Sequence, residues 1–391
     1  MKKIIFINSH PIQYFAPLYK YLAQQDVPVE AWYCSDASIK GIDDKGFGVK
    51  VKWDIPLLEG YASRFFKNHS WKPSHFNGFF GLINLGIIRQ LRKEPKAIIV
   101  VHGWAYCTHF LVLMLAKLMG HEVCLRSEMP YNQELMKAGI KQRIKRMGLK
   151  YLLFPRIHKF LYIGTQNKRF YESYGIAENR LFFCPYSVDN MRFQAEAATL
   201  APQKILLKES KGIPAGDKVI IYSGKYIAKK RPLDIINAFL QLNKPGVWLI
   251  MVGEGELRGE MEKLLQAHES KRVILTGFIN QSEIARYYTL GDVFVMCSTI
   301  GETWGLSVNE AMNFGLSLLI SETTGCSIDL VQEGANGFVF KTGSVDDLSN
   351  KLQRLLTALE KDEAAFREKS LKIVDKYSYK TIYSTLKAHV V

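Results

Sequence analysis

The sequence is poor in acidic residues for its size, and it lacks any motif of paired cysteines. Its 391 residues include 37 Asp and Glu against 52 Lys and Arg, a net charge of +15. The six cysteines show no C-x-x-C pair and no metal-ligand spacing, and several lie inside apolar runs such as EVCLRS. This spacing argues against a disulfide framework and a structural metal, and it predicts a cytoplasmic protein with buried free thiols.

No hydrophobic run is suited to a signal peptide or an uninterrupted membrane span. Two lysines precede only four apolar residues, 4–7, which is fewer than a secretory segment needs. The most hydrophobic window, residues 97–120, is β-branched at first and then rich in Leu and Met. It predicts a buried strand, a turn and a buried helix, because polar residues interrupt it at His102, Gly103, His109 and Lys117.

The basic excess lies almost wholly in the first half of the chain. Residues 1–200 hold 28 basic and 15 acidic residues, a net +13, whereas residues 201–391 hold 24 and 22, a net +2. This asymmetry indicates a polyanionic partner such as nucleic acid, a membrane surface or phosphates, and a basic surface that only maintains solubility is the alternative. Helix-turn-helix, zinc-finger and RRM signatures are missing, so no nucleic acid is expected.

Short β-rich runs alternate with amphipathic stretches along most of the chain. This pattern is typical of an α/β protein with parallel sheets and helices on both faces. The second half repeats a βα unit between residues 218 and 321, and residues 36–83 are expected to be an irregular excursion. In the first half we expect strands at 3–8, 29–34, 97–102, 122–127, 159–163 and 181–185, and helices at 15–25, 84–94, 106–119 and 139–156.

Two domains are predicted, each a doubly wound Rossmann-like sheet, and they should face each other across a cleft. We place the first domain at residues 1–200 and the second at 201–376, with a polar linker at 196–204. The last helix, within 377–391, is expected to pack back on the first domain. Function should lie in the cleft, at the carboxyl ends of the strands.

Two glutamates mark the most informative stretch, residues 297–340. Glu302 falls in the loop after an expected strand, and Glu310 lies on the next helix. Gly305, Leu306 and Ser307 supply the first backbone N–H groups of that helix, which suit an anion such as a phosphate. An eight-residue spacing of glutamates is common on surface helices, so the glycine-rich turn at a strand end carries more of the argument.

A cluster of cations follows the first strand of the same sheet. The run from Gly224 to Pro232 contains Lys225 and Lys230, which can neutralise a diphosphate. A solvated basic turn is the alternative. It is weakened because four cations crowd a helix N-terminus, where positive charge is unfavourable unless an anion binds.

These motifs together resemble the donor-binding domain of retaining GT-B glycosyltransferases, glycosyltransferase family 4 (glycosyl transferases group 1). The resemblance rests on the G-x-x-x-x-x-K element from Gly224 to Lys230, the VGEGELR turn and the E-x7-E pair from Glu302 to Glu310. It also includes TGFINQSEIARYY and EGANGFVF, and it extends into the first half through YIGTQNKRFYESYGI and FCPYSVDNMRF. It covers most of the chain.

The resemblance implies a role for each matched residue. Lys225, where the family usually has Arg, would hold the donor diphosphate together with Lys230, and the amides of Gly305, Leu306 and Ser307 would bind phosphate. Glu310 would bind the donor ribose, and Glu302 the donor sugar on its reacting face. The backbone near Ile279 would contact the base, and His102 would lie beside the reacting sugar.

The first domain departs from the family pattern in one loop. Ser9–Tyr14 replaces the usual glycine-rich loop after the first strand, so His10, Gln13 and Tyr14 are expected on the acceptor side of the cleft. Glu128 also ends a strand and would orient an acceptor hydroxyl or act as a base, with helix capping as its alternative. His102 has a bland alternative too, since a histidine at a strand end can simply satisfy a core backbone group. Cys326 stands where a second glycine is frequent, and we interpret it as a packing residue.

The expected reaction is transfer of a sugar from a UDP- or GDP-sugar to a glycan or lipid-linked acceptor, with retention of configuration. Two lysines and a helix N-terminus can stabilise the leaving diphosphate, so we expect no metal and no other cofactor. Because no carboxylate can be assigned as a nucleophile, a same-face substitution is the hypothesis. Residues 139–156 form a basic amphipathic helix that suits an anionic membrane surface, which would make the protein peripheral on the inner membrane face; an ordinary solvated helix is the alternative.

Three other functions compete with this one. A GT-B sugar-nucleotide epimerase would convert a UDP-sugar without any acceptor. A nucleic-acid-binding protein is suggested by charge alone. A catalytically inactive partner subunit is disfavoured because Lys225, Lys230, Glu302 and Glu310 are all present.

Overall fold

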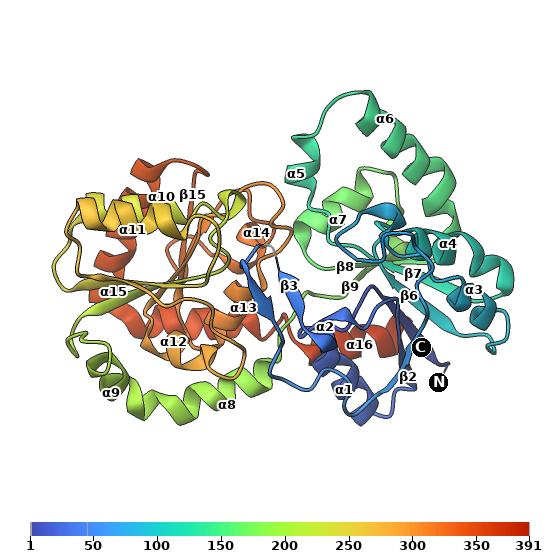
Figure 1. Cartoon of the computed structure of the whole chain (residues 1–391), viewed down its shortest axis with the longest axis horizontal. Coiled ribbons are helices and arrows are strands. Elements are labelled where there is room, and N and C mark those ends of the chain that lie inside the picture. The colour runs from blue at the N-terminus through green and yellow to red at the C-terminus, as the bar shows by residue number, and fades with distance from the viewer. Residues whose placement is uncertain (1, 45, 391) are drawn as a thin grey trace. The chain divides into compact units, whose positions relative to one another are not determined.

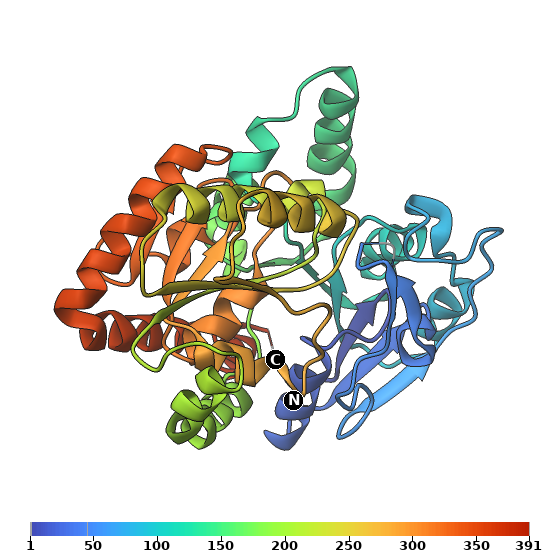
Figure 2. The same cartoon turned by 60° about the vertical axis from the view of Figure 1, so that its left-hand side comes forward.

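The computed structural model describes residues 2–44 and 46–390 of the chain (Figure 1, Figure 2). The chain divides into two compact units. Unit 1 contains Met1–Ile42, Ile55–Tyr186 and Tyr379–Val391, and unit 2 contains Asp43–Asp54 and Ser187–Ser378. Each unit is described in turn.

Unit 1 is built on a parallel seven-stranded sheet. Its central strands are fully buried and rich in Ile and Val, as parallel strands covered on both faces should be. The sheet has the order β5 (Ala62–Phe65), β2 (Val29–Tyr33), β1 (Ile4–Asn8), β6 (Ile98–His102), β7 (Glu122–Arg126), β8 (Lys159–Tyr162) and β9 (Leu181–Phe183). The six strands expected from the sequence are therefore confirmed, to within about two residues at each end.

The helices of unit 1 connect these strands. Residues 97–120 form strand β6, a turn and helix α4, as predicted, and no helix in the described part of the chain is long and apolar enough to cross a membrane. The α-helices are α1 (Ala16–Gln24), α2 (Ala37–Lys40), α3 (Leu85–Leu91), α4 (Cys107–Leu115), α5 (Tyr131–Leu135), α6 (Ile140–Met147), α7 (Thr165–Glu172) and α16 (Tyr379–His389). After α6 the chain continues as a π-helical segment, Gly148–Leu153, whose Leu149 and Leu153 join the core.

Helix α16 brings the end of the chain into unit 1. It lies against α1 and β9. The Thr385 hydroxyl donates to the Phe183 carbonyl at 2.7 Å, and the Tyr379 hydroxyl donates to the Tyr14 carbonyl at 3.2 Å. Ile382, Leu386 and Val390 are buried there, so the last helix contributes to the core of unit 1.

Unit 2 contains a second parallel sheet, of six strands. Its order is β12 (Val273–Leu275), β11 (Val247–Val252), β10 (Lys218–Ser223), β13 (Val293–Met296), β14 (Ser317–Ser321) and β15 (Gly337–Phe340). The order runs outward from β10 in both directions, as in a doubly wound sheet, so a topological switch point lies beside β10. Each unit is therefore a doubly wound α/β sheet, as predicted from the sequence.

Helices cover the sheet of unit 2 in two groups. Helix α10 (Pro232–Leu242) packs on α15 (Val345–Val374), while α8 (Asn190–Leu200) packs on α12 (Ile284–Leu290) and α13 (Leu306–Asn313). The predicted capping box of α15 is present, because the Asp347 N–H donates to the Ser344 hydroxyl at 3.2 Å. The remaining helices are α9 (Lys204–Glu209), α11 (Arg258–Ala267) and α14 (Ser327–Leu330).

Two expectations about irregular segments need correction. Residues 36–83 are largely irregular, as expected, but they also contain strand β5 and a hairpin of β3 (Ile42–Asp44) and β4 (Val49–Val51). Strand β5 is short and half-exposed at the sheet edge, so it shows no apolar run, and an ion pair of Arg64 with Glu30 of β2 at 3.2 Å helps hold it. Residues 196–204 are helical rather than an extended linker, and the division between the units falls after Tyr186 instead of after residue 200.

Candidate active site

The carboxyl ends of β10 and β13 bring the cationic run and the glutamate motif of unit 2 together. Lys225 and Lys230 follow β10, and Glu302 follows β13. Lys230 and Glu302 form an ion pair, and both side chains are largely buried. The Thr299 N–H donates to the Lys229 carbonyl at 2.9 Å, which ties the two loops through their backbones. The sequence-predicted cation and carboxylate therefore share one site.

Two opposing influences act on Lys230. Burial, and then the charges of Lys229 and Lys225, lower the pKa of Lys230 to about 7. The carboxylate of Glu302 opposes them, because an adjacent anion favours the ammonium form. An incoming diphosphate would add further negative charge and shift the balance toward the ammonium.

Helix α13 begins at this site with a backbone conformation that only glycine adopts readily. Gly305 is the residue before the helix and has a φ of 102°. A Cβ added there would lie 2.8 Å from the Met296 sulfur, so any side chain is strained as well as crowded. The Ser307 hydroxyl donates to the Ser223 carbonyl at 3.4 Å, so this first turn, including Leu306, lies against the end of β10. The expected anion-binding amides thus lie at the switch point of the sheet.

Glu310 is buried on α13 and held by two donors. The Gln281 side-chain amide donates to its Oε1 at 3.2 Å, and the Tyr288 hydroxyl donates to its Oε2 at 2.8 Å. Gln281 is held in turn by Arg192, whose Nη2 donates to its Oε1 at 2.8 Å. These contacts place Glu310 beside the loop that contains Ile279. Sequence reasoning missed Gln281 and Tyr288, since no spacing along the chain marks a partner that comes from the turn before α12 or from α12 itself.

The loop after β10, which contains Gly224 and Lys225, depends on a close approach between backbones. The Gly224 N–H donates to the Val252 carbonyl at 3.0 Å, and Gly253 bridges to Gly277. A Cβ on Gly253 would lie 1.9 Å from the Gly224 carbonyl oxygen, so only glycine fits. The start of the VGEGELR turn therefore has a local structural role, which is to bring the end of β11 against the loop that carries Lys225.

In unit 1, His102 ends strand β6 in a buried polar network. Tyr19 donates its hydroxyl proton to Asn8 at 2.8 Å, so its oxygen accepts from His102 Nε2 at 3.0 Å. Burial, and then Arg126 and His109, hold the pKa of His102 well below its usual range, so the ring is neutral. In this tautomer Nδ1 carries a lone pair, and it has no hydrogen-bond partner among the described residues. The ring can accept a hydrogen bond there.

Arg126 and Glu128 lie at the end of the neighbouring strand, β7. The buried Arg126 guanidinium lies beside the stacked rings of Phe15 and Tyr186, with its Cζ 5.2 and 4.7 Å from the ring centroids. The Tyr186 hydroxyl donates to Glu128 at 2.6 Å, which fixes this carboxylate. Sequence reasoning singled out Glu128 but not Arg126, although an arginine in the otherwise apolar run EVCLRS is a visible signal.

The three residues expected on the acceptor side lie in the turn between β1 and α1. His10 stacks on His75 at 4.1 Å, and its Nδ1 lies 3.0 Å from the Ser9 hydroxyl. Burial, and then His75, lower the pKa of His10 to about 3, so this ring stays neutral at physiological pH. Gln13 and Tyr14 are half-buried beside it. The turn is anchored within unit 1.

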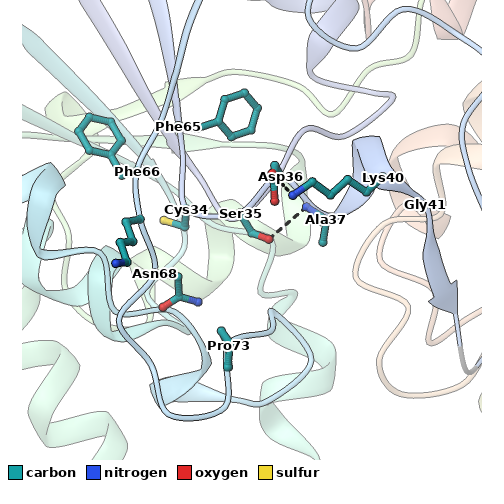
Figure 3. Close-up of a pocket in the computed structure, with 11 residues that line it drawn as sticks. Cys34, Ser35, Asp36, Ala37, Lys40, Gly41, Phe65, Phe66, Asn68 and Pro73 are labelled. Carbon is teal, nitrogen blue, oxygen red and sulfur yellow. Dashed lines mark hydrogen bonds and ion pairs between the residues drawn. The ribbon is translucent and has the colours of Figure 1, made fainter.

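A pocket opens in unit 1 where β2 and β5 end (Figure 3). It has a volume of about 530 Å³, and the residues that line it include the aromatic Phe65 and Phe66 and the basic Lys40 and Lys67. Figure 3 shows Lys40 directed at Asp36, and the two form an ion pair at 2.7 Å. The lining therefore offers both apolar and charged contacts to a ligand.

The cysteines and the possible cation ligands of the described chain are easily summarised. All six cysteines are free and five are buried, Cys326 among them, so its interpretation as a packing residue is confirmed. Within residues 2–44 and 46–390, His, Cys, Asp and Glu side chains form no group of three or more that could hold a metal ion.

Comparison with known proteins places this site in a family. Residues 203–372 match the family model described as Glycosyl transferases group 1. They form a group 1 glycosyltransferase domain. The segment contains Lys225, Lys230, Glu302 and Glu310, so every donor-side residue singled out from the sequence lies inside the matched domain.

Curated relatives extend the similarity over about half of the chain or less. A sulfoquinovosyl transferase of Arabidopsis thaliana is 31% identical over 183 residues, which cover 46% of this chain and 34% of the relative. An alpha-monoglucosyldiacylglycerol synthase of Acholeplasma laidlawii is 30% identical over 137 residues, 34% of each chain. A lipopolysaccharide 1,2-N-acetylglucosaminetransferase of Salmonella typhimurium is 27% identical over 216 residues, 52% of this chain and 56% of the relative. The chain thus spans between a third and somewhat over half of their lengths.

Solved structures match the fold along the whole chain. HepE of Anabaena, in complex with UDP and glucose, superposes with a TM-score of 0.72 and 15% identity, covering 99% of both chains. A glycosyltransferase of Rickettsia africae superposes with a TM-score of 0.74 and 15% identity, covering 99% of this chain and 97% of the other. At this identity the likeness concerns the fold, and it supports GT-B for the whole chain together with the group 1 domain.

Proposed function

We propose that the chain is a retaining glycosyltransferase that moves a sugar from a UDP- or GDP-sugar to a glycan or lipid-linked acceptor at the cytoplasmic face of a membrane. The observation that carries this proposal is the pairing of Lys230 with Glu302 beside the start of α13, inside the group 1 domain. A cation, a carboxylate and free helix amides meet there. This set suits a sugar diphosphate, which is anionic at one end and rich in hydroxyls at the other.

The leaving group is the first requirement of the reaction. As the bond between the sugar and the diphosphate breaks, negative charge develops on the diphosphate, and fixed positive charge stabilises the transition state. We assign this role to Lys225, Lys230 and the amides of Gly305, Leu306 and Ser307, with no metal ion required. Lys230 exchanges its pairing with Glu302 for pairing with the diphosphate, which frees the carboxylate for the sugar hydroxyls.

The donor is positioned by the other residues of the group 1 domain. Glu310 would accept hydrogen bonds from the ribose hydroxyls, and the backbone at Ile279 would contact the base. In unit 1, we assign His102 to the reacting sugar, where its neutral ring can accept a hydrogen bond. The acceptor hydroxyl then attacks the face that the diphosphate leaves and gives its proton to the departing diphosphate oxygen, so the configuration is retained.

We assign the acceptor to unit 1, near the pocket at the ends of β2 and β5 and the side chains of His10, Gln13, Tyr14 and Glu128. Exposed aromatic rings pack on the apolar faces of sugars, and ammonium groups bind phosphate or carboxylate. The pocket combines Phe65 with Lys67, so an acceptor sugar that carries a negative charge fits its chemistry.

Helix α6 supports a membrane-bound acceptor. Ile140, Ile144 and Met147 recur at helical spacing and are 74%, 64% and 61% exposed, although the side chains are apolar. Figures 1 and 2 show the helix standing out from the sheet of unit 1. Lys141 and Arg143 are exposed on the same helix, so an anionic lipid surface could receive both kinds of side chain.

Two variants test the donor assignment. Glu302→Ala and Lys230→Ala should abolish transfer from the nucleotide-sugar that wild type uses, while circular dichroism and thermal unfolding stay close to wild type. Near-normal turnover in either variant would contradict the assignment. Incubating wild type with the UDP-sugar and no acceptor separates the epimerase alternative, because an epimerase converts the sugar whereas a transferase only hydrolyses it slowly.

A further inference from the structure

A hairpin from the first half of the chain belongs to the group 1 half of the molecule. Residues 43–54, which include β3 and β4, lie in unit 2, although the chain on either side of them lies in unit 1 (Figure 1). The hairpin lies outside both motifs that pointed to the donor site in the sequence, and the proposed function does not use it.

Polar contacts attach the hairpin to the loop after β12. The Asn280 side-chain amide donates to the Lys52 carbonyl at 2.8 Å. The Ser282 hydroxyl and N–H both donate to the Asp54 carboxylate, at 2.5 and 3.2 Å. Asn280 directly follows Ile279, so the hairpin is anchored at the segment assigned to the base.

Aromatic contacts also connect the hairpin with Phe278 and with Lys225, the lysine assigned to the diphosphate. The Phe47 ring packs edge-on with Phe278 at 5.0 Å, and Trp53 lies 6.4 Å from Phe278. The Lys225 ammonium lies 4.7 Å from the centroid of Phe47. One ring therefore touches both the residue before Ile279 and the lysine assigned to the diphosphate.

Only one orientation of a bound nucleotide agrees with the roles assigned to Lys225 and Ile279. Its diphosphate belongs at Lys225, and its base belongs at Ile279, near the Gln281–Glu310 pair that marks the ribose. Phe47 contacts the elements at both ends, and it is only half-buried, so part of its ring is open to a ligand. Bases have a flat π face that stacks on aromatic rings whatever their sequence identity.

We propose that Phe47 is a nucleotide-binding residue that packs on the base of the donor, held in place by the bonds of Asp54 with Ser282. This proposal rests on the proposed function, since it takes the nucleotide site of the group 1 domain as given. It adds to that site a ligand contact from a part of the chain outside the matched family segment, 203–372.

The test compares nucleotides with and without the second phosphate. Isothermal titration calorimetry of wild type with UDP, GDP and ADP identifies the base that binds, and the matching monophosphate is then titrated as well. Phe47→Ala should weaken binding of both nucleotides about tenfold, the size expected for one lost base–aromatic stack. Phe47→Tyr keeps the ring and should restore binding. Asp54→Asn should weaken both nucleotides by a smaller factor, because it loosens the anchor only.

The controls separate this contact from its neighbours. Phe76→Ala removes an exposed ring of unit 1 and should leave both affinities unchanged. An effect of Phe47→Ala on the diphosphate alone would mean that the ring acts only through Lys225, and it would overturn the proposal, as would unchanged binding of both nucleotides. If wild type binds no nucleotide, the proposed function itself fails. If wild type and Phe47→Ala bind the nucleotide equally well, only the proposal about Phe47 fails.

Discussion

At the scale of single residues, the proposed donor site depends on buried charges whose partners come from different segments of the chain. Lys230 is buried beside two other lysines and is paired with one carboxylate, Glu302. Glu310 is buried and is held by an amide and a hydroxyl. Both residues are therefore poised to change partners when an anion or a ribose arrives, and their protonation or hydrogen bonding can be measured.

The lowered pKa of Lys230 predicts a pH dependence of nucleotide binding. Above pH 7 the free protein increasingly loses the ammonium proton, whereas the diphosphate complex retains it, so binding takes up a proton. Affinity for the nucleoside diphosphate should therefore fall between pH 7.5 and 9, by up to about tenfold per pH unit. Calorimetry in buffers of different ionisation enthalpy measures the proton uptake directly.

Lys230→Met is the matched control for this prediction. It keeps the length of the side chain but has no titrating group, so its weaker binding should show little change over the same pH range. A wild-type affinity that is flat between pH 7.5 and 9 would show that the pairing with Glu302 keeps Lys230 fully charged.

The pocket of unit 1 makes a separate prediction for Lys67. Lys67→Ala should raise the KM for a charged acceptor about tenfold, because a hydrogen bond to a charged group contributes about 1.5–3 kcal/mol. The affinity for the nucleoside diphosphate should not change. Lys72→Ala removes an exposed lysine outside the pocket lining, and an equal effect of the two variants would argue for general electrostatics instead of a site.

The residues of the proposed donor site could be singled out one by one, because their motifs are local in sequence. Lys225, Lys230, Glu302 and Glu310 each lie in a loop or helix that directly follows a recognisable strand. Their partners could not be predicted in the same way. The site also includes side chains from other segments of the chain, namely Gln281, Tyr288 and Phe47. A single sequence does not show which distant segments come into contact.

At the scale of elements, the strongly patterned strands were predictable and the weakly patterned segments were not. The six strands predicted in the first half are recognisable as short runs rich in β-branched, aliphatic and aromatic residues. Strand β5 and the hairpin of β3 and β4 are short and mixed in polarity, so periodicity does not identify them. Helix α6 was predicted correctly as a helix, but its apolar positions divide in two. Leu149 and Leu153 just beyond it anchor the segment, and Ile140 and Ile144 remain outside the core.

Helix α6 predicts a measurable attraction to anionic membranes. Ile140→Ser with Ile144→Ser should abolish flotation with vesicles that contain phosphatidylglycerol at low salt, because burial of an Ile side chain contributes about 1.5–3 kcal/mol. Folding stability should change by less than about 0.5 kcal/mol per site, as both side chains are exposed.

The charged part of this attraction can be separated from the apolar part. Lys141→Ala with Arg143→Ala should weaken vesicle binding roughly fivefold for each cation and reduce its dependence on salt. Wild type that stays with the soluble fraction in anionic vesicles at low salt would remove the membrane proposal while leaving the donor assignment intact.

At the scale of the whole molecule, the two units are not continuous in sequence. The chain passes between them at four points, after residues 42, 54, 186 and 378. Composition reveals the division into two α/β halves, because the βα repeat and the change in charge are both visible. It does not reveal that α8 and the hairpin join unit 2, because no composition shift marks either segment.

The last helix should stabilise the unit that is formed mainly by the first half of the chain. Leu386→Ala should lower the stability of unit 1 by about 2–5 kcal/mol, because Leu386 is 1% exposed and packs in its core. Hydrogen exchange measured by mass spectrometry should show faster exchange in β1 and β9 but not in β10 and β13. Ser384→Ala, on the exposed side of α16, is the matched control, and equal exchange in both variants would contradict the role of the helix.

The position of α16 also has a consequence for how the protein is made. A ribosome releases unit 1 almost complete after about residue 186, yet the helix that fills its remaining apolar surface is synthesised nearly two hundred residues later. Unit 2 is made in the opposite order, because its hairpin at residues 43–54 is translated before the rest of the unit. Unit 1 therefore cannot finish folding until α16 has been translated, so the nascent chain exposes apolar surface of unit 1 while unit 2 is being made.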